Sequence, residues 1–183
     1  MGAISLEVLD RERLGKGGAR QTRRQKLVPV VVYGQNQETR HLAVKAHDLS
    51  MALAKHARLF DLTAGDGAVT SCLVRDVQRH PVSEDVVHVD FLVVHAGQRV
   101  TTELPVRLLG TPIGVKQGGQ VRKLMARVRV SCQVAELPSF FDIDITNLEA
   151  GKNLLVKDLS TEQLRLLNPE HVAVVQITKM RAK

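Results

Sequence analysis

Hydrophobic and polar residues alternate along much of this chain. Near its start, Ile4, Leu6 and Val8 alternate with Ser5 and Glu7, and this period of two predicts a strand with one buried face. Valine-rich or alternating stretches recur through the first half, over residues 28–33, 41–46, 59–63, 68–77 and 86–94. The first half is therefore expected to consist mainly of strands.

The stretch 86–94 combines a core face with a polar one. Alternation predicts that Val87, Val89 and Phe91 point one way, and that His88 and Asp90 point the other. We therefore expect a histidine and an aspartate on one side of a strand.

Two short helices are expected among these strands. Residues 19–26 predict the first, on which Arg20, Arg23 and Arg24 share a face because they are spaced at i, i+3 and i+4. The second is predicted over residues 49–57, where apolar side chains recur along one side.

The second half is richer still in strand signals. Gly, Pro and Asn turns separate predicted strands over residues 99–109, 120–134, 140–146, 153–156 and 172–178. One or two helical turns are expected over 161–167. The pattern changes near residue 95, so we expect a first domain of residues 1–94 and a C-terminal β-domain of residues 95–183. The predicted fold class is mainly β.

Composition indicates a globular protein, because 44% of the 183 residues are hydrophobic and 25% are charged. No stretch approaches the roughly 18 apolar residues that a membrane helix needs, and the first residues do not resemble a secretory signal. A cytoplasmic location is expected. Cys72 and Cys132 are too few for a zinc site or a disulfide framework, and no cofactor is expected.

Positive charge is concentrated in one segment of the first half. The formal net charge is +7, and residues 11–26 hold seven Lys or Arg with a single Glu. Forked guanidinium groups, an ammonium group and free N–H groups at a helix start all favour phosphate. The segment therefore predicts a nucleic-acid contact. A solvated basic helix without a ligand is the alternative.

His88 and Asp90 allow three interpretations. They could be two ligands of a metal site completed by His80 or His41. They could instead recognise RNA, with the carboxylate accepting from a base N–H, a 2′-hydroxyl or the neighbouring imidazole. An exposed polar strand face without a ligand is the third interpretation.

Other residue types narrow the classes of function. The chain has one tyrosine, Tyr33, and no tryptophan, so a platform that stacks unpaired bases is not expected, and a structured duplex is the favoured ligand. Gln78 ends a predicted strand, where it could reach RNA. A P-loop is excluded because Gly17 follows Lys16, and we find no enzyme signature.

Several segments together, and in order, resemble one family. They include Val-Gln-Arg-His-Pro over 77–81 and His-Val-Asp-Phe over 88–91. The other segments are residues 15–24, 28–34, 104–106, 114–119 and 137–144. This series is similar to the bacterial ribosomal protein L twenty-five family, in its long, two-domain CTC (general stress protein) form.

The resemblance implies an N-terminal six-stranded β-barrel with short helices that binds 5S rRNA, followed by a C-terminal β-domain. It places the protein in the 50S subunit of the cytoplasmic ribosome, supporting translation. The RNA-facing residues of the family, transferred one by one, are Arg13, Lys16, Arg23, Arg24, Tyr33, His88 and Asp90, and Arg20 and Gln78 are further transfers.

No membrane or small-molecule partner is expected. The second domain carries Arg122, Lys123, Arg127 and Arg129, which would contact 23S rRNA or a neighbouring large-subunit protein, or form a solvated strand face. Two alternatives concern the whole protein. One is a stress protein that joins the ribosome conditionally, and the other is a metal-dependent enzyme that uses His80, His88 and Asp90.

Overall fold

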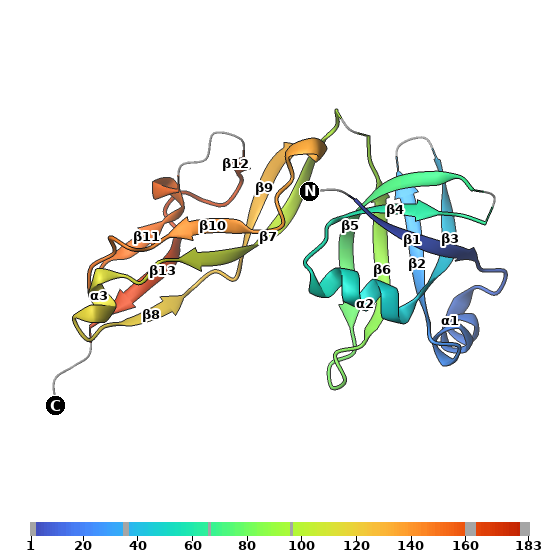
Figure 1. The fold of residues 1–183 in the computed structure, drawn as a ribbon, viewed down its shortest axis with the longest axis horizontal. Coiled ribbons are helices and arrows are strands. Elements are labelled where there is room, and N and C mark those ends of the chain that lie inside the picture. The colour runs from blue at the N-terminus through green and yellow to red at the C-terminus, as the bar shows by residue number, and fades with distance from the viewer. Residues whose placement is uncertain (1–2, 35–36, 66, 96, 160–163, 180–183) are drawn as a thin grey trace. The chain divides into compact units, whose positions relative to one another are not determined.

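The computed structural model describes residues 3–34, 37–65, 67–95, 97–159 and 164–179. The chain forms two compact units, Met1–Ala96 and Gly97–Lys183, and strands predominate in both (Figure 1). The predicted mainly β fold class is confirmed. Within the described residues, no helix is long and apolar enough to cross a membrane.

The first unit is a closed six-stranded barrel with two helices. Its elements are β1 (Ile4–Asp10), α1 (Gly15–Arg24), β2 (Leu27–Gly34), β3 (Gln37–Lys45), α2 (Ala46–Ala54), β4 (Leu59–Thr63), β5 (Val69–Arg79) and β6 (Val86–Val93). The strand order is β1-β3-β2-β6-β5-β4. Strand β1 pairs in parallel with β4, which closes the barrel, and β2 pairs in parallel with β6. The barrel that the resemblance implied is therefore present.

Alternation builds the barrel core. Val30 of β2 lies opposite Val89 of β6, and neither side chain is exposed. Phe60 and Phe91 meet edge to face, with ring centroids 5.6 Å apart and planes at 71°. Burying a Val or Phe side chain contributes roughly 1.5–3 kcal/mol, so these inward residues make the barrel wall a rigid support for its outer face.

Both helices lie a few residues from their predicted positions. Helix α1 begins at Gly15 rather than at residue 19. The sequence prediction placed its start too late because glycines are weak helix formers. It ends at Arg24, and Lys26 adopts the left-handed conformation at φ 59°. Helix α2 ends at Ala54, before His56 at φ 55°.

The second unit contains two sheets around one core. Its strands are β7 (Arg99–Leu109), β8 (Gln120–Lys123), β9 (Arg127–Gln133), β10 (Phe141–Asp144), β11 (Asn153–Leu155), β12 (Arg165–Leu166) and β13 (Ala173–Thr178). Its helices are α3 (Ile113–Lys116) and the 3-10 turns η1 (Val134–Glu136) and η2 (Val156–Asp158). One sheet has the order β10-β7-β9-β12 and the other β11-β13-β8. Buried side chains from both sheets share a cluster that includes Leu104, Val128 and Val174.

Two predictions for this unit are wrong. The strand expected over 120–134 is divided into β8 and β9, because the amides of Leu124 and Met125 both donate to the Val174 carbonyl of β13. The helical turns expected over 161–167 fall partly outside the described residues, and Arg165–Leu166 form β12 instead. Leu164 and Leu166 both pack on the core, and a spacing of two suits a strand.

Candidate nucleic-acid interface

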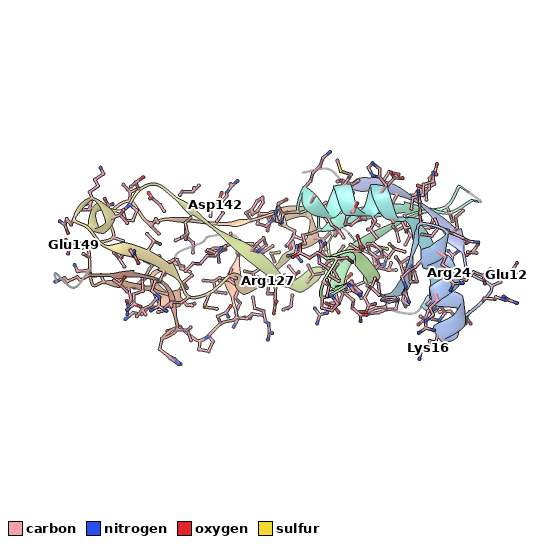
Figure 2. The ribbon with its side chains drawn as sticks, turned by 90° about the horizontal axis from the view of Figure 1, so that it is seen from below. Glu12, Lys16, Arg24, Arg127, Asp142 and Glu149 are labelled. Atoms are coloured by element: carbon pink, nitrogen blue, oxygen red, sulfur yellow. The ribbon has the colours of Figure 1, made fainter. Side chains whose placement is uncertain are left out.

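Helix α1 presents its cations to solvent. Its buried side consists of Gly18 and Thr22, and the Thr22 hydroxyl donates to the Gly18 carbonyl at 2.9 Å. The exposed side chains of the helix are Lys16, Arg20, Gln21, Arg23 and Arg24. Figure 2 shows Lys16 and Arg24 toward opposite ends of α1. The predicted basic helix is present, and it has no acidic residue in its first turn.

Hydrogen bonds from Arg11 and to Gln21 of α1 hold Arg13, in the loop before the helix, in place. The Arg11 guanidinium donates to the Arg13 carbonyl at 3.2 Å, and the Arg13 guanidinium donates to Gln21 Oε1 at 3.3 Å. A Cβ at Gly18 would lie 2.2 Å from the Arg13 carbonyl oxygen, so this close approach of loop and helix requires glycine. Arg11 therefore positions Arg13. Its place in the sequence did not distinguish it from the other cations of the segment.

A hydrogen bond joins α1 to β6. The Arg23 guanidinium donates to the carbonyl of Val87 at 3.1 Å. Val87 is the residue that the pairing with β5 skips, because Gln78 lies opposite His88 and Arg79 lies opposite Val86. This bulge in β6 is where the helix is bound to the strand that carries His88.

The same bulge changes which residues of β6 face the core. Val86, Val89 and Phe91 belong to the buried barrel cluster, whereas Val87 is only half-buried and lies outside it. The prediction that Val87 shares the inner face with Val89 and Phe91 is therefore wrong, because one additional residue in a strand shifts the alternation. His88 and Asp90 do point away from the core, as predicted.

His88 and Asp90 contact each other on the outer face. His88 Nδ1 lies 2.9 Å from Asp90 Oδ1, and the two side chains are 24% and 33% exposed. The neighbouring imidazole, one of the partners considered for the carboxylate, is therefore in contact with it. Because this contact uses Nδ1, the ring offers Nε2 to an outside group.

Outward-facing residues of β2, β5 and β6 form what we call the polar wall, namely Tyr33, Asp76, Gln78, His88 and Asp90. Gln78 lies opposite His88, and Asp76 lies opposite Asp90. Tyr33 pairs with Leu92 and is half-buried, two residues farther along β2 than Val31, the partner of Asp90. Sequence reasoning missed Asp76. Its spacing of two from Gln78 was the available signal.

The structure does not assemble the metal site considered for His80, His88 and Asp90. His80 Nδ1 accepts from the backbone N–H groups of Val82 and Ser83, at 3.3 and 3.2 Å, within its own turn. Among the residues described, no group of three His, Cys, Asp or Glu side chains is placed to hold a metal ion.

The cysteines are buried thiols with raised pKa values. Burial raises the pKa of Cys72 to about 12, with a smaller contribution from Asp61, and burial also raises the pKa of Cys132. A nucleophilic cysteine must ionise near neutral pH, so neither residue is a candidate nucleophile.

Some charges in the second unit are paired within it. Arg107 donates to both carboxylate oxygens of Asp142, at 2.7 and 2.6 Å (Figure 2 labels Asp142), and Arg129 pairs with Glu103 at 3.3 Å. Lys123 donates to a backbone carbonyl of β7. Of the four basic residues noted in the sequence of this unit, Arg122 and Arg127 have neither an ion pair nor a side-chain hydrogen bond to any residue that the structure describes.

Comparison with known proteins gives a match in each unit. Residues 6–91 match the model of the Ribosomal L25p family, and residues 99–181 match that of "Ribosomal protein TL5, C-terminal domain". A large ribosomal subunit protein bL25 of Syntrophus aciditrophicus is 32% identical over 186 aligned residues, which cover 98% of this chain and 93% of the relative. Proteins of the same name are 37% identical in Syntrophobacter fumaroxidans (86% and 82% covered) and 34% identical in Pseudomonas putida (81% and 77% covered).

Proposed function

This chain belongs to the Ribosomal L25p family, and we propose that its N-terminal barrel binds 5S rRNA within the large ribosomal subunit. The family and the relatives are named for the ribosome, so the chain is a structural ribosomal protein rather than the metal-dependent enzyme considered above.

The observation that carries the proposal is the hydrogen bond from Arg23 to the carbonyl of Val87. Helix α1 offers exposed cations, and His88 follows Val87 directly on β6. The bond therefore holds the cationic helix α1, which can bind phosphates, beside His88 of the polar wall, which can form hydrogen bonds. Such a combination suits a structured RNA, in which the backbone supplies affinity and the groove supplies identity.

The groove that suits the polar wall is the minor groove of A-form RNA. The major groove of such a helix is deep and narrow, whereas its minor groove is wide and presents 2′-hydroxyls and base edges. In our proposal, His88 Nε2 and the carboxylate of Asp90 bond to these groups. Gln78 adds an amide beside His88, and Tyr33 contributes its ring or hydroxyl farther along the wall.

Five cations are assigned to phosphates, namely Arg13, Lys16, Arg20, Arg23 and Arg24. If all five bind, the logarithm of the affinity falls against the logarithm of the salt concentration with a slope of about −3.5 to −4.5. In the second unit, Arg122 and Arg127 are the residues that we expect to meet neighbouring rRNA or protein.

A filter-binding titration of the full chain tests the proposal. The probes are a 5S rRNA transcript and an unrelated hairpin RNA of similar length, each at two salt concentrations. We expect the 5S transcript to bind at least about tenfold more tightly at the higher salt concentration, where the nonspecific phosphate contribution is weaker. Equal affinity for the two RNAs at both salt concentrations would contradict the proposal.

A further inference from the structure

A second bulge turns Asp76 outward. Val74 of β5 points into the barrel core opposite Phe91, and in a regular strand residue 76 would point inward as well. The pairing with β6 skips Arg75, so Asp76 lies opposite Asp90 on the outer face and is exposed. The one-residue bulge is what places this carboxylate on the polar wall.

The bulge brings two carboxylates to directly opposed positions. In an antiparallel pair, such positions have Cβ atoms about 4.5–5.5 Å apart, and like charges there destabilise the sheet. Asp90 has His88 as a partner at 2.9 Å, while Val31, on its other side, offers no polar group. Asp76 forms no ion pair with any residue in the described part of the chain.

From this arrangement we propose that Asp76 is a specificity-determining residue of the RNA site, acting by keeping phosphate off the polar wall. The inference rests on the proposed function and adds a residue that neither the family resemblance nor the sequence pattern selected. With Asp90, it makes the centre of the wall anionic, whereas α1 beside the wall is cationic.

Asp76 can discriminate between RNAs because phosphates are negatively charged, whereas the groups exposed in an RNA groove are neutral. Every RNA has phosphates, so a wholly cationic surface binds any RNA. Two carboxylates repel phosphate but accept hydrogen bonds from 2′-hydroxyls and from amino groups of bases. An RNA that places phosphates on α1 and its minor groove on the polar wall binds the cationic helix and the anionic wall at the same time. When an RNA binds in another position, a phosphate lies against Asp76 and is repelled. Discrimination therefore includes a repulsive contribution.

The test compares Asp76→Asn with a control of equal charge change, Asp48→Asn. Asp48 is exposed on α2, which packs against β1 and β3 rather than against the polar wall. Full-length wild type and both variants are titrated with the 5S rRNA transcript and with the unrelated hairpin at one low salt concentration. Thermal unfolding of each variant verifies that it is folded.

We expect Asp76→Asn to bind the unrelated hairpin about three- to tenfold more tightly than Asp48→Asn does, since one repulsive charge at close range is removed. The increase in affinity for 5S rRNA should be smaller, so the ratio of the affinity for 5S rRNA to that for the hairpin falls. Two results would overturn the inference: equal behaviour of the two variants, or a loss on 5S rRNA alone, which would make Asp76 a direct hydrogen-bonding contact. If wild type already shows no preference for 5S rRNA, the proposed function fails instead.

Discussion

The guanidinium of Arg23 lies 3.1 Å from the carbonyl oxygen of Val87. Arg23 therefore differs from its neighbours on α1, although sequence spacing treats Arg20, Arg23 and Arg24 alike. It uses one N–H on the protein and keeps others for an outside group, because a guanidinium has five. We infer that it fixes the orientation of the helix relative to the polar wall as well as supplying charge.

Replacement of Arg23 by Ala should therefore have a different effect from replacement of Arg20. Arg20→Ala removes one exposed cation, so we expect a similar loss of affinity for 5S rRNA and for an unrelated hairpin, and a salt slope shallower by about 0.7–0.9. Arg23→Ala should in addition reduce the preference for 5S rRNA. Salt-dependent filter binding measures both effects, and identical profiles for the two variants would show that the bond to Val87 has no part in recognition.

Asp90→Asn should impair recognition rather than general affinity. The amide can no longer act as a charged acceptor for the His88 Nδ1–H, which orients the ring. We expect a loss of about 1–3 kcal/mol on 5S rRNA and little change on the unrelated hairpin. Asp48→Asn serves again as the control for net charge. Equal losses on both RNAs would exclude a recognition role for Asp90.

Two neighbouring glycines of α1 should respond oppositely to alanine. A Cβ at Gly18 would lie 2.2 Å from the Arg13 carbonyl oxygen, whereas nothing lies within 4 Å of a Cβ at Gly17. Gly17→Ala should stabilise the protein by roughly 0.5–1 kcal/mol, because alanine is the better helix former. Gly18→Ala should destabilise it by about 1–3 kcal/mol and weaken RNA binding by displacing the loop. Chemical denaturation measures the free energy of unfolding of each variant. Equal values for the two variants would show that the Arg13 carbonyl can move away from residue 18 without loss of stability.

The Arg107–Asp142 pair predicts a small acid-dependent contribution to stability. Bonding to Arg107 holds the pKa of Asp142 below its usual value of 3.8. A depressed folded-state pKa stabilises the protein above the unfolded value and loses this effect as the pH falls through the folded value. Both side chains are about half exposed, so solvent screening keeps this contribution small at neutral pH.

Asp142→Asn should therefore lower the denaturation midpoint at neutral pH and leave it unchanged at a pH well below 3.8. Glu170→Gln, at an exposed position of the same unit, controls for a general effect of charge. If Asp142→Asn destabilises the protein equally at both pH values, the cause is lost packing and not the ion pair.

The alternation of hydrophobic and polar residues was enough to predict most strands of the barrel. It also placed His88 and Asp90 together, because a spacing of two within one strand is a local property that no distant contact has to supply. The basic helix face was likewise predictable from the spacing of Arg20, Arg23 and Arg24. The resemblance to the family, which rested on ordered motifs, is confirmed by the comparisons.

Features that depend on pairing between strands could not be predicted in this way. The bulges at Arg75 and Val87 arise where β5 and β6 meet, and they decide that Asp76 faces outward and that Val87 leaves the core. Helix α1 begins at Gly15 because the Arg13 carbonyl packs against Gly18, a contact between a loop and a helix.

Sequence alone thus determined the strand-rich fold, the basic helix and the His88–Asp90 face, since each follows from periods of two or of 3.6 residues within one segment. Only the tertiary structure decided that Arg23 is bound to β6 and that Asp76 lies opposite Asp90. These relationships depend on the register of chain segments far apart in sequence, and the shift of a single residue at a bulge exchanges the faces of a strand.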